Sequence, residues 1–348
     1  TRIHVIGAGT MGADIAIWCA INNFHVTLQD TSESQMGKAV LNANKSIKRK
    51  IKDKSLAQKT IDRLIPDVSG HGIKYADVII EAIIENLEAK QNLFKKIESL
   101  AKPTAILATN TSSIRIEEIA SQLSSPERLI GIHFFNPVRQ MPLVEVIKTE
   151  IVDITTENAT YDFVNKIGKL PLPVKSSPGF LVNAVLVPYL QNSMRSIDGG
   201  YKPEQIDQAM KKWGMPMGPL ELIDVVGLDI LAAAGKTMLK AGDIPQCLKE
   251  LIQNKYLGKK TNKGFYDWNK GKKLKRKYKP LNPTESFQLA ENLISPLIKQ
   301  TEKLAKSGVV ESSELADAGV IFGTGFAPFR GGPINYQNKK NNEKIAGI

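Results

Sequence analysis

The 348-residue sequence contains few of the residues that build covalent or metal-held frameworks. It has two cysteines, Cys19 and Cys247, and four histidines, with no CxxC pair and no Cys/His spacing typical of a zinc site. Two isolated cysteines exclude a disulfide scaffold and fit a reducing compartment. We therefore expect a cytoplasmic protein without a metal site.

Long apolar runs are also absent from the sequence. No run approaches the roughly 20 residues that a membrane-spanning helix needs, and no basic segment followed by an apolar one is typical of a secretion signal. Hydrophobic residues make up 42% and charged residues 24% of the chain, as in ordinary globular proteins. The length suffices for two or three domains. Because Thr1 directly precedes the first predicted strand, we expect the chain to be part of a longer protein.

Acidic residues are fewer than basic ones, 35 against 47. The net charge is +12, and much of the excess lies in residues 44–54 (NKSIKRKIKDK) and 269–279 (NKGKKLKRKYK). Neither stretch interleaves stacking aromatic residues with the charges, and no helix-turn-helix or RNA-binding motif accompanies them. We interpret them as solvated faces and a linker. An anionic substrate ranks next, and nucleic acid ranks last.

Strands and helices alternate through the first half of the chain. Residues 2–6 predict a strand, 11–23 a helix and 25–30 a second strand, which together form a βαβ unit with parallel strands. The alternation continues with predicted strands at 77–83, 105–110, 129–135 and 143–149, and with predicted helices at 86–101 and 116–123. We therefore predict one Rossmann-type, doubly wound α/β domain over residues 1–175.

The pattern changes after residue 175. From residue 179 the apolar spacing is helical and strand signals vanish, which predicts an all-helical domain over residues 176–268. The lysine-rich residues 269–280 predict a basic linker. We interpret residues 281–348 as a further helical domain.

This last domain repeats the one before it. Residues 292–309 align with 185–201, which places Pro296 over Pro188. The segment FGTGFAP (322–328) likewise aligns with WGMPMGP (213–219). We interpret residues 281–348 as a second, degenerate copy, so that two related helical domains follow in tandem. Chance similarity of two helices punctuated by proline and glycine is the alternative.

A glycine-rich turn joins the first predicted strand to the first helix. Gly7, Gly9 and Gly12 form G-x-G-x-x-G, and this position between strand and helix predicts dinucleotide binding. Gly7 permits the tight turn, Gly9 the close approach of a pyrophosphate, and Gly12 the close packing of helix on strand. The N–H groups at the helix start attract the phosphates. Met11 offers its backbone N–H there, or is simply an apolar helix residue.

The choice of cofactor depends on one carboxylate. Asp30 ends the second predicted strand, 18 residues after Gly12. A carboxylate at this position accepts hydrogen bonds from the adenosine ribose hydroxyls and repels a 2′-phosphate. The sequence therefore predicts NAD rather than NADP as the cofactor.

One histidine lies within a predicted apolar strand. His133 stands in GIHFFNPV (131–138), and Glu145, twelve residues later, interrupts the apolar strand LVEVI. Burying either group is costly unless it is hydrogen-bonded. If the two strands are neighbours, Glu145 accepts the N–H of one ring nitrogen and leaves the other nitrogen to act as a general base. A buried polar pair without a reaction is the alternative.

Two more polar residues are candidates for substrate contact. Ser112, in TNTSSI (109–114), follows a predicted strand at the edge where α/β folds bind ligands. Its alternative role is to cap the following helix. Asn183 is a polar residue on an otherwise apolar helix of the second domain. It either contributes to the cleft or is a satisfied core amide.

In the order and spacing of these motifs the sequence resembles the L-3-hydroxyacyl-CoA dehydrogenase family. It is most similar to the dehydrogenase part of the multifunctional α-subunit of bacterial fatty-acid β-oxidation complexes, and the hydratase half has no counterpart in it. The matching motifs extend over nearly the whole chain: GAGTMG, VIIEAIIENLEAK, NTSS, GIHFFNPV, LVEVIKT, SPGFLVN, MPMGPLELIDVVGLD and GKKTNKGFY. The second helical copy, with GTGFAPFRGGP, resembles the multifunctional members rather than the short ones.

The resemblance implies roles for individual residues. His133 is the catalytic base and Glu145 its partner, while Ser112 and Asn183 bind the reacting hydroxyl or the thioester. The implied contacts with NAD, besides the glycine turn and Asp30, are Glu85, Lys90, Ser112, Asn136 and Lys260. The implied contacts with the CoA phosphates are Ser46, Lys52 and Lys54.

Two residues depart from the family pattern. Ala184 stands where many relatives have arginine, so any role of that charge is absent. Phe322 stands where some bacterial relatives have a tyrosine that contacts substrate, so that contact is not carried over.

These expectations combine into one predicted function, the reversible oxidation of a (3S)-3-hydroxyacyl-CoA to the 3-oxoacyl-CoA with NAD+ as hydride acceptor. The resemblance also implies an enoyl-CoA hydratase domain in the same chain, a thiolase subunit as partner, and a homo-oligomer or complex. Two alternatives stay open. The chain is another NAD-dependent β-hydroxyacid dehydrogenase, or it is a non-catalytic assembly module of such a complex.

Overall fold

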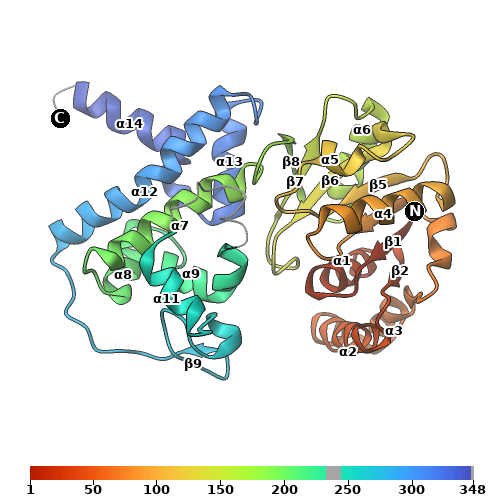
Figure 1. The fold of residues 1–348 in the computed structure, drawn as a ribbon, viewed down its shortest axis with the longest axis horizontal. Coiled ribbons are helices and arrows are strands. Elements are labelled where there is room, and N and C mark those ends of the chain that lie inside the picture. The colour runs from red at the N-terminus through yellow and green to blue at the C-terminus, as the bar shows by residue number, and fades with distance from the viewer. Residues whose placement is uncertain (233–243, 346–348) are drawn as a thin grey trace. The chain divides into compact units, whose positions relative to one another are not determined.

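The computed structural model describes residues 1–232 and 244–345. The chain divides into two compact units, with the boundary between Phe180 and Leu181. The first unit is an α/β structure and the second is mainly helical, as Figure 1 shows for each. Each unit is described below by itself.

The first unit is built on an eight-stranded sheet with the order β3-β2-β1-β4-β5-β6-β7-β8. Its strands are β1 (Arg2–Ile6), β2 (His25–Gln29), β3 (Leu64–Pro66), β4 (Val78–Glu81), β5 (Ile106–Thr109), β6 (Leu129–Phe134), β7 (Leu143–Lys148) and β8 (Leu170–Lys175). The order 3-2-1-4-5-6 is the strand order of dinucleotide-binding Rossmann domains. The predicted Rossmann-type fold class is confirmed.

Helices connect these strands. They are α1 (Thr10–Ile21), α2 (Glu33–Lys50), α3 (Lys54–Asp62), α4 (Leu87–Leu100), α5 (Ile116–Ala120) and α6 (Ile154–Lys166). Side chains in the sequence determine where several of them begin. Ser32, Asp53, Asn86 and Asp153 each accept a hydrogen bond from a backbone N–H in the first turn of the helix that follows. The main apolar core joins α1 and α6 to the sheet.

The sheet is not wholly parallel. β7 runs antiparallel to β6, whereas the other neighbouring strands are parallel. β8 escapes prediction from sequence because Pro171 and Pro173 interrupt it. Proline cannot donate to a strand ladder, so it is tolerated at the edge of a sheet. β8 is the last strand in the order and therefore has such an edge.

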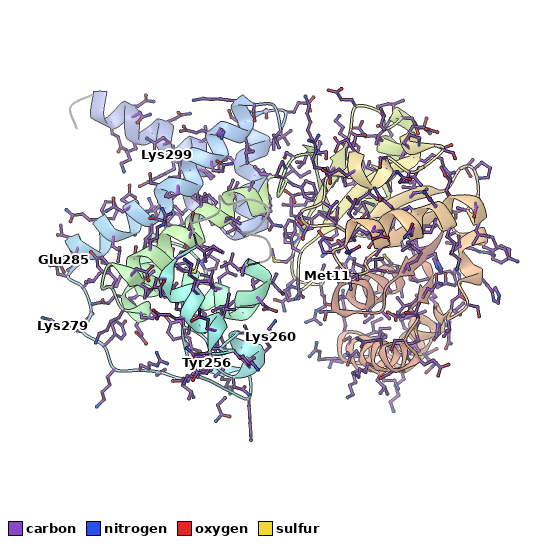
Figure 2. All side chains as sticks on the ribbon, viewed as in Figure 1. Met11, Tyr256, Lys260, Lys279, Glu285 and Lys299 are labelled. Carbon is purple, nitrogen blue, oxygen red and sulfur yellow. The ribbon has the colours of Figure 1, made fainter. Side chains whose placement is uncertain are left out.

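The second unit begins with α7 (Val182–Asp198). It continues with α8 (Pro203–Trp213), α9 (Pro219–Val226), α11 (Gln246–Gln253), α12 (Pro283–Lys306), α13 (Ser313–Thr324) and α14 (Pro333–Ile345). α12 packs against α7 and α8 (Figure 1). Asn282 and Glu285 form a capping box at the start of α12, and Glu285 is labelled in Figure 2.

The expectation that strand signals vanish after residue 179 is wrong at one place. A small antiparallel hairpin joins β9 (Trp268–Asn269) to β10 (Lys272–Lys273), at the start of the segment predicted as linker. Its two turn residues, Lys270 and Gly271, both have positive φ. That conformation is typical of a two-residue hairpin turn with glycine at its second position. The residues after Lys273 have no helix or strand up to α12.

Paired features recur in the two halves of the second unit. Asp207 in α8 accepts hydrogen bonds from the N–H groups of Leu220 and Glu221, at the start of α9. Asp317 in α13 makes the same two bonds to Ile334 and Asn335, at the start of α14. Both helices α7 and α12 also contain an internal proline, Pro188 and Pro296 respectively. These features support the two-copy interpretation, which stays a prediction.

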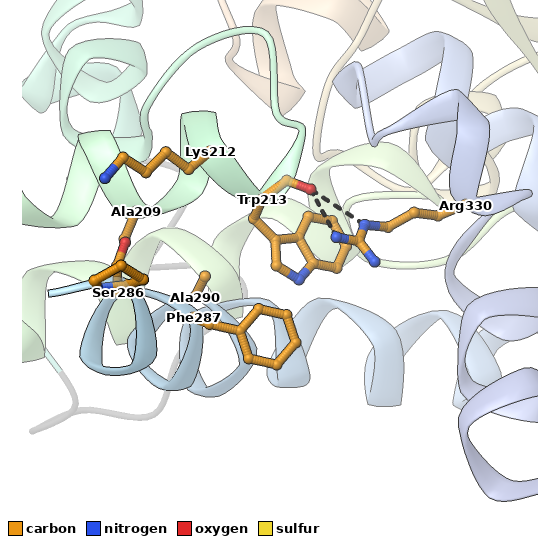
Figure 3. Close-up of a pocket in the computed structure, with 8 residues that line it drawn as sticks. Ala209, Lys212, Trp213, Ser286, Phe287, Ala290 and Arg330 are labelled. Carbon is orange, nitrogen blue, oxygen red and sulfur yellow. Dashed lines mark hydrogen bonds between the residues drawn. The ribbon is translucent and has the colours of Figure 1, made fainter. Parts of the chain in front are cut away.

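One arginine connects the two halves. Arg330 donates two hydrogen bonds to the carbonyl oxygen of Trp213 and stacks 4.0 Å from the centre of its indole ring (Figure 3). The indole N–H of Trp213 in turn donates to Glu291 in α12. A small pocket beside this contact is lined by Trp213, Phe287 and Arg330, among others.

Candidate active site

The glycine turn after β1 has the geometry that a pyrophosphate requires. Gly7 has φ +104°, and a Cβ there would lie 2.5 Å from the carbonyl oxygen of Ala82. A Cβ on Gly12 would lie 1.8 Å from the carbonyl oxygen of Gly7. Around Gly9, by contrast, a Cβ would meet nothing within 4 Å. Close packing therefore explains why Gly7 and Gly12 cannot carry a side chain. At Gly9 the absence of a side chain instead leaves room for a ligand.

The start of α1 is open to an anion. Gly9 is its N-cap and has no side chain that could accept a hydrogen bond from the first-turn N–H groups. These groups and the helix dipole attract phosphate. Met11 lies in this first turn (Figure 2), and its side chain is partly buried against the core. The side chain of Met11 therefore packs as that of an ordinary apolar helix residue.

Asp30 directly follows β2, beside the glycine turn. Its Oδ2 accepts the N–H of Ala8 at 2.7 Å and its Oδ1 accepts the N–H of Ser32 at 2.8 Å. These two bonds fix the carboxylate next to the loop that contains Gly9. The position fits the predicted contact with an adenosine ribose.

Glu85 orders the loop that carries Ser112. Its Oε1 accepts hydrogen bonds from the hydroxyl of Thr111 at 2.6 Å, from the N–H of Ser112 at 2.8 Å and from the N–H of Ser113 at 3.0 Å. Burial alone would raise the pKa of Glu85, but the nearby Lys90 and these hydrogen bonds outweigh it, so the pKa is lowered. Glu85 is therefore held as a carboxylate that shapes this loop.

Ser112 does not cap the next helix. α5 begins at Ile116 and its N-cap is Arg115. The N–H of Ile116 donates to Oγ of Ser176, not to Ser112. The alternative role considered for Ser112 is therefore wrong. Ser112 lies beyond the carboxyl end of β5, at the edge where parallel sheets bind ligands.

His133 and Glu145 are directly opposite each other across β6 and β7. The Nδ1 atom of His133 lies 2.7 Å from Oε2 of Glu145. The histidine is 6% exposed and the glutamate 0%. Since a carboxylate only accepts, Nδ1 carries the proton, and in the neutral ring Nε2 is an acceptor. The rings of Phe135 and Phe180 lie 4.5 and 5.7 Å from the imidazole, centre to centre, and shield it.

Asn110 also belongs to this edge. Its side-chain oxygen accepts the N–H of Phe134 at 2.9 Å, which ties the end of β5 to the end of β6. Asn136, predicted to contact NAD, follows β6 and is exposed. The structure thus brings His133, Glu145 and the loop of Ser112 to neighbouring strand ends.

Comparison with known proteins identifies the family. Residues 2–177 match the profile "3-hydroxyacyl-CoA dehydrogenase, NAD binding domain", and residues 179–268 match "3-hydroxyacyl-CoA dehydrogenase, C-terminal domain". The chain belongs to the 3-hydroxyacyl-CoA dehydrogenase family. The predicted family, its dehydrogenase class and the NAD cofactor are confirmed.

Individual relatives agree with this family. The chain is 34% identical to the fatty acid oxidation complex subunit alpha of Pseudomonas putida over 95% of its length, but covers only 50% of that relative. The chain therefore spans about half the length of the curated relatives it matches. The crystal structure of 3-hydroxybutyryl-CoA dehydrogenase from Escherichia coli K12 is 25% identical, with a TM-score of 0.87, and the match covers 100% of this chain and 95% of that one. The (S)-3-hydroxybutyryl-CoA dehydrogenase of Ralstonia eutropha is 35% identical, with a TM-score of 0.72, over 77% and 99% of the two chains.

The lysines implied to bind CoA phosphates lie around the junction of α2 and α3. Ser46 is in α2 and half-buried, whereas Lys52 and Lys54 are exposed and flank Asp53, the N-cap of α3. Lys50, at the end of α2, lies over the indole of Trp18, 4.1 Å from the ring centre. This part of the basic stretch is therefore more than a solvated face.

Asn183 and Lys260 belong to the second unit, and their approach to His133 stays a prediction. Asn183 is half-buried near the start of α7. Lys260, labelled in Figure 2, forms an ion pair with Asp229 at 2.5 Å. Burial would raise the pKa of Asp229, but its bonds with Lys260 outweigh this and lower it. Asp229 escapes sequence reasoning because surface ion pairs have no fixed spacing.

A buried aspartate holds the segment that carries Lys260. Asp224 in α9 accepts hydrogen bonds from the N–H groups of Phe265 and Tyr266 and from the indole N–H of Trp268. A Cβ on Gly258 or Gly264 would collide with Asp224. The glycines of GKKTNKGFY are therefore explained by close packing.

The two departures from the family pattern have different surroundings. Ala184 is buried in α7, and Phe322 in α13 is 43% exposed. Neither supplies a polar group.

The residues of the first unit fit NAD, and they offer no metal centre. The open space around Gly9, the first-turn N–H groups of α1 and the hydrogen-bonded carboxylate of Asp30 are compatible with a bound dinucleotide. Within residues 1–232 and 244–345, no three His, Cys, Asp or Glu side chains are grouped as metal ligands. None of the helices in these ranges is long and apolar enough to cross a membrane.

Proposed function

We propose that this chain catalyses the NAD-dependent oxidation of (3S)-3-hydroxyacyl-CoA to 3-oxoacyl-CoA in fatty-acid β-oxidation. The observation that carries the proposal is the buried hydrogen bond between His133 Nδ1 and Glu145 Oε2. It fixes the tautomer in which Nε2 accepts a proton. A general base needs this property and this rigid placement.

Several residues of the first unit hold the cofactor in this proposal. The turn of Gly7, Gly9 and Gly12, with the backbone of Met11, binds the pyrophosphate, and Asp30 binds the adenosine ribose. NAD+, when bound, accepts the hydride from C3 of the substrate. The further contacts proposed by resemblance to the family are Glu85, Lys90, Ser112, Asn136 and Lys260.

The chain's own side chains move the proton. Nε2 of His133 takes the proton of the C3 hydroxyl while Glu145 keeps its bond to Nδ1. The carboxylate stabilises the imidazolium that forms, because opposite charges attract strongly in a site that excludes water. Ser112 and Asn183 hold the reacting oxygen and so fix its distance to Nε2, which favours reaction by positioning.

We also assign a function to the basic stretch at residues 44–54. Lys52 and Lys54 bind the phosphates of CoA, because exposed ammonium groups attract phosphate without a geometric requirement. The hydroxyl of Ser46 donates a hydrogen bond to the same phosphates. This contact distinguishes a CoA thioester from a free hydroxy acid.

We extend the proposal to the chain's surroundings. The relatives named as fatty acid oxidation complex subunits alpha support an enoyl-CoA hydratase domain in the same polypeptide. A thiolase subunit as partner is proposed from the family resemblance alone. We also propose that the protein forms a homo-oligomer or complex and is cytoplasmic. We propose three domains, residues 1–175, 176–268 and 281–348, with residues 269–280 as a basic linker before the third.

The test is NADH formation by this chain with two matched substrates. We expect turnover of (3S)-3-hydroxybutyryl-CoA and little turnover of free 3-hydroxybutyrate. Equal turnover of both would favour another β-hydroxyacid dehydrogenase. No NADH from either, with NAD binding intact, would favour an assembly module.

A further inference from the structure

Glu81 is a buried carboxylate without a part in the chemistry described above. It is the last residue of β4 and is 0% exposed. In the sheet it pairs with Ile6 of β1 and with Thr109 of β5. Because Gly7 follows Ile6, and Ser112 lies shortly after Thr109, Glu81 stands between the two loops of the dinucleotide site.

Each oxygen of Glu81 has its own hydrogen-bond donors. Oε1 accepts from Nζ of Lys90 at 2.6 Å and from the N–H of Ile83 at 2.7 Å. Oε2 accepts from the hydroxyl of Thr109 at 2.6 Å. Lys90 itself is only 1% exposed. The carboxylate and the ammonium therefore form an ion pair that is almost completely removed from water.

Lys90 connects Glu81 to the Ser112 loop through Glu85. Its Nζ lies 3.4 Å from Oε2 of Glu85, and Oε1 of Glu85 accepts the N–H groups of Ser112 and Ser113. A continuous series of contacts thus leads from Glu81 through Lys90 and Glu85 to the backbone of Ser112. Glu81 is the member of the series that is farthest from solvent.

Stability alone is a poor explanation for this pair. A buried ion pair often gains little over apolar side chains of similar volume, because both charges lose hydration. The same strand has an ion pair at its other end, where Asp77 lies 2.6 Å from Lys102, and that pair is partly exposed. The buried pair of Glu81 and Lys90 is better explained by its effect on the positions of neighbouring side chains in the ligand site.

We propose that Glu81 is a positioning residue of the dinucleotide site, which holds Lys90 and Glu85 and so places the Ser112 loop against the nicotinamide end of the cofactor. This inference rests on the proposed function. It concerns one half of the cofactor, because the glycine turn and Asp30 bind the adenosine half.

The test compares two ligands on one variant. Glu81→Gln keeps the volume, removes the charge and leaves Lys90 with one carboxylate. We measure dissociation constants by calorimetry for NAD+ and for ADP-ribose, which lacks nicotinamide. Because the variant loses charge-assisted hydrogen bonds, we expect NAD+ to bind about tenfold more weakly and ADP-ribose less than about twofold more weakly.

Two further variants make the result decisive. Asp77→Asn removes an acid from the other end of β4 and should change neither constant. Thr109→Val removes one hydrogen bond to Glu81 with little change in volume, and should shift the NAD+ constant in the same direction by a smaller factor. It serves as the test if Glu81→Gln does not fold.

An equal loss for both ligands in Glu81→Gln and Thr109→Val would show a merely structural role and overturn the inference. So would unchanged binding of NAD+. The proposed function fails separately, if the unmodified chain binds NAD+ but does not oxidise the CoA substrate.

Discussion

The sheet of the first unit buries two histidines that have very different hydrogen-bond partners. His4, in β1, has a hydroxyl and an amide as ring partners, with Thr27 Oγ1 at 2.7 Å and Gln29 Oε1 at 3.0 Å. His133, in β6, has the carboxylate of Glu145 at 2.7 Å. Both rings are buried and both are hydrogen-bonded. The partner's charge, rather than burial, separates them.

That difference decides which ring has a carboxylate as its direct hydrogen-bond partner. Burial lowers the pKa of His4, and the weaker raising effects of Gln29 and of Asp67 do not offset it. A proton on His4 would have Asp67 as its counter-charge at 3.9 Å, which is beyond hydrogen-bond distance. On His133 the same proton is next to Glu145. His4, with Thr27 and Gln29, therefore suits a structural role, whereas the pair of His133 and Glu145 suits proton transfer.

The largest effect should come from the two histidines themselves. We expect His133→Gln to lower kcat on the order of 10⁴-fold, the upper end for general acid–base catalysis. His4→Gln should lower the melting temperature and leave kcat near the wild-type value. Steady-state kinetics and thermal unfolding of both variants check this. Near-wild-type turnover of His133→Gln would make that histidine structural as well.

The partner's charge provides a second, smaller effect. Glu145→Gln keeps the volume but cannot stabilise an imidazolium, so we expect kcat to fall on the order of 10²-fold. Thr27→Val, which removes a neutral partner of His4, should not change kcat. Comparable losses in both variants would mean that strand packing, and not charge, matters in β6 and β7.

Two aspartates extend the comparison to cofactor choice. Asp30 and Asp67 each accept two backbone N–H groups, Asp67 those of His71 and Gly72. Asp30 lies beside the glycine turn, and Asp67 lies near His4. We expect Asp30→Ala to narrow the preference for NAD over NADP by about tenfold, because a charge-assisted contact and a repulsion are lost. Asp67→Ala should not change the ratio of kcat/KM values, although it also loses two hydrogen bonds.

The smallest effect concerns acid stability. The folded pKa of His4 is lowered from 6.5, so the unfolded chain binds more protons than the folded one just below that pH. Stability from the neutral ring is complete above about pH 6.5 and decreases as the pH falls toward the folded pKa. Denaturant unfolding of wild type and His4→Gln from pH 7.5 to 5 measures this. The variant should lose less stability on acidification than the wild type.

Some of this site could be predicted from sequence. His133 and Glu145 interrupt apolar strands, and two such interruptions on neighbouring strands indicate a pair. Glu81 carries the same signal in VIIEA, but its partner Lys90 lies on a helix. Helical spacing alone does not show which lysine of α4 turns toward the sheet. The pair therefore becomes visible only in three dimensions.

Other parts could not be predicted, for identifiable physical reasons. The antiparallel course of β7 depends on a loop, residues 135–142, that is too short for a helical crossover. β8 contains prolines that only an edge strand accepts. The hairpin of β9 and β10 depends on two residues with positive φ, of which only Gly271 is an evident signal.

The antiparallel pairing of β6 and β7 has a consequence for how this sequence can change over time. Side chains alternate between the faces of a strand, so a slip of one residue would turn Glu145 to the face opposite His133. Substitutions in residues 135–142 are compatible with the pair, whereas an insertion or deletion of one residue is not, unless a bulge absorbs it. Lys169 donates from Nζ to the carbonyl oxygens of Val138 and Met141 and so fixes the path of this loop. The length of the loop thus preserves the hydrogen bond between His133 and Glu145.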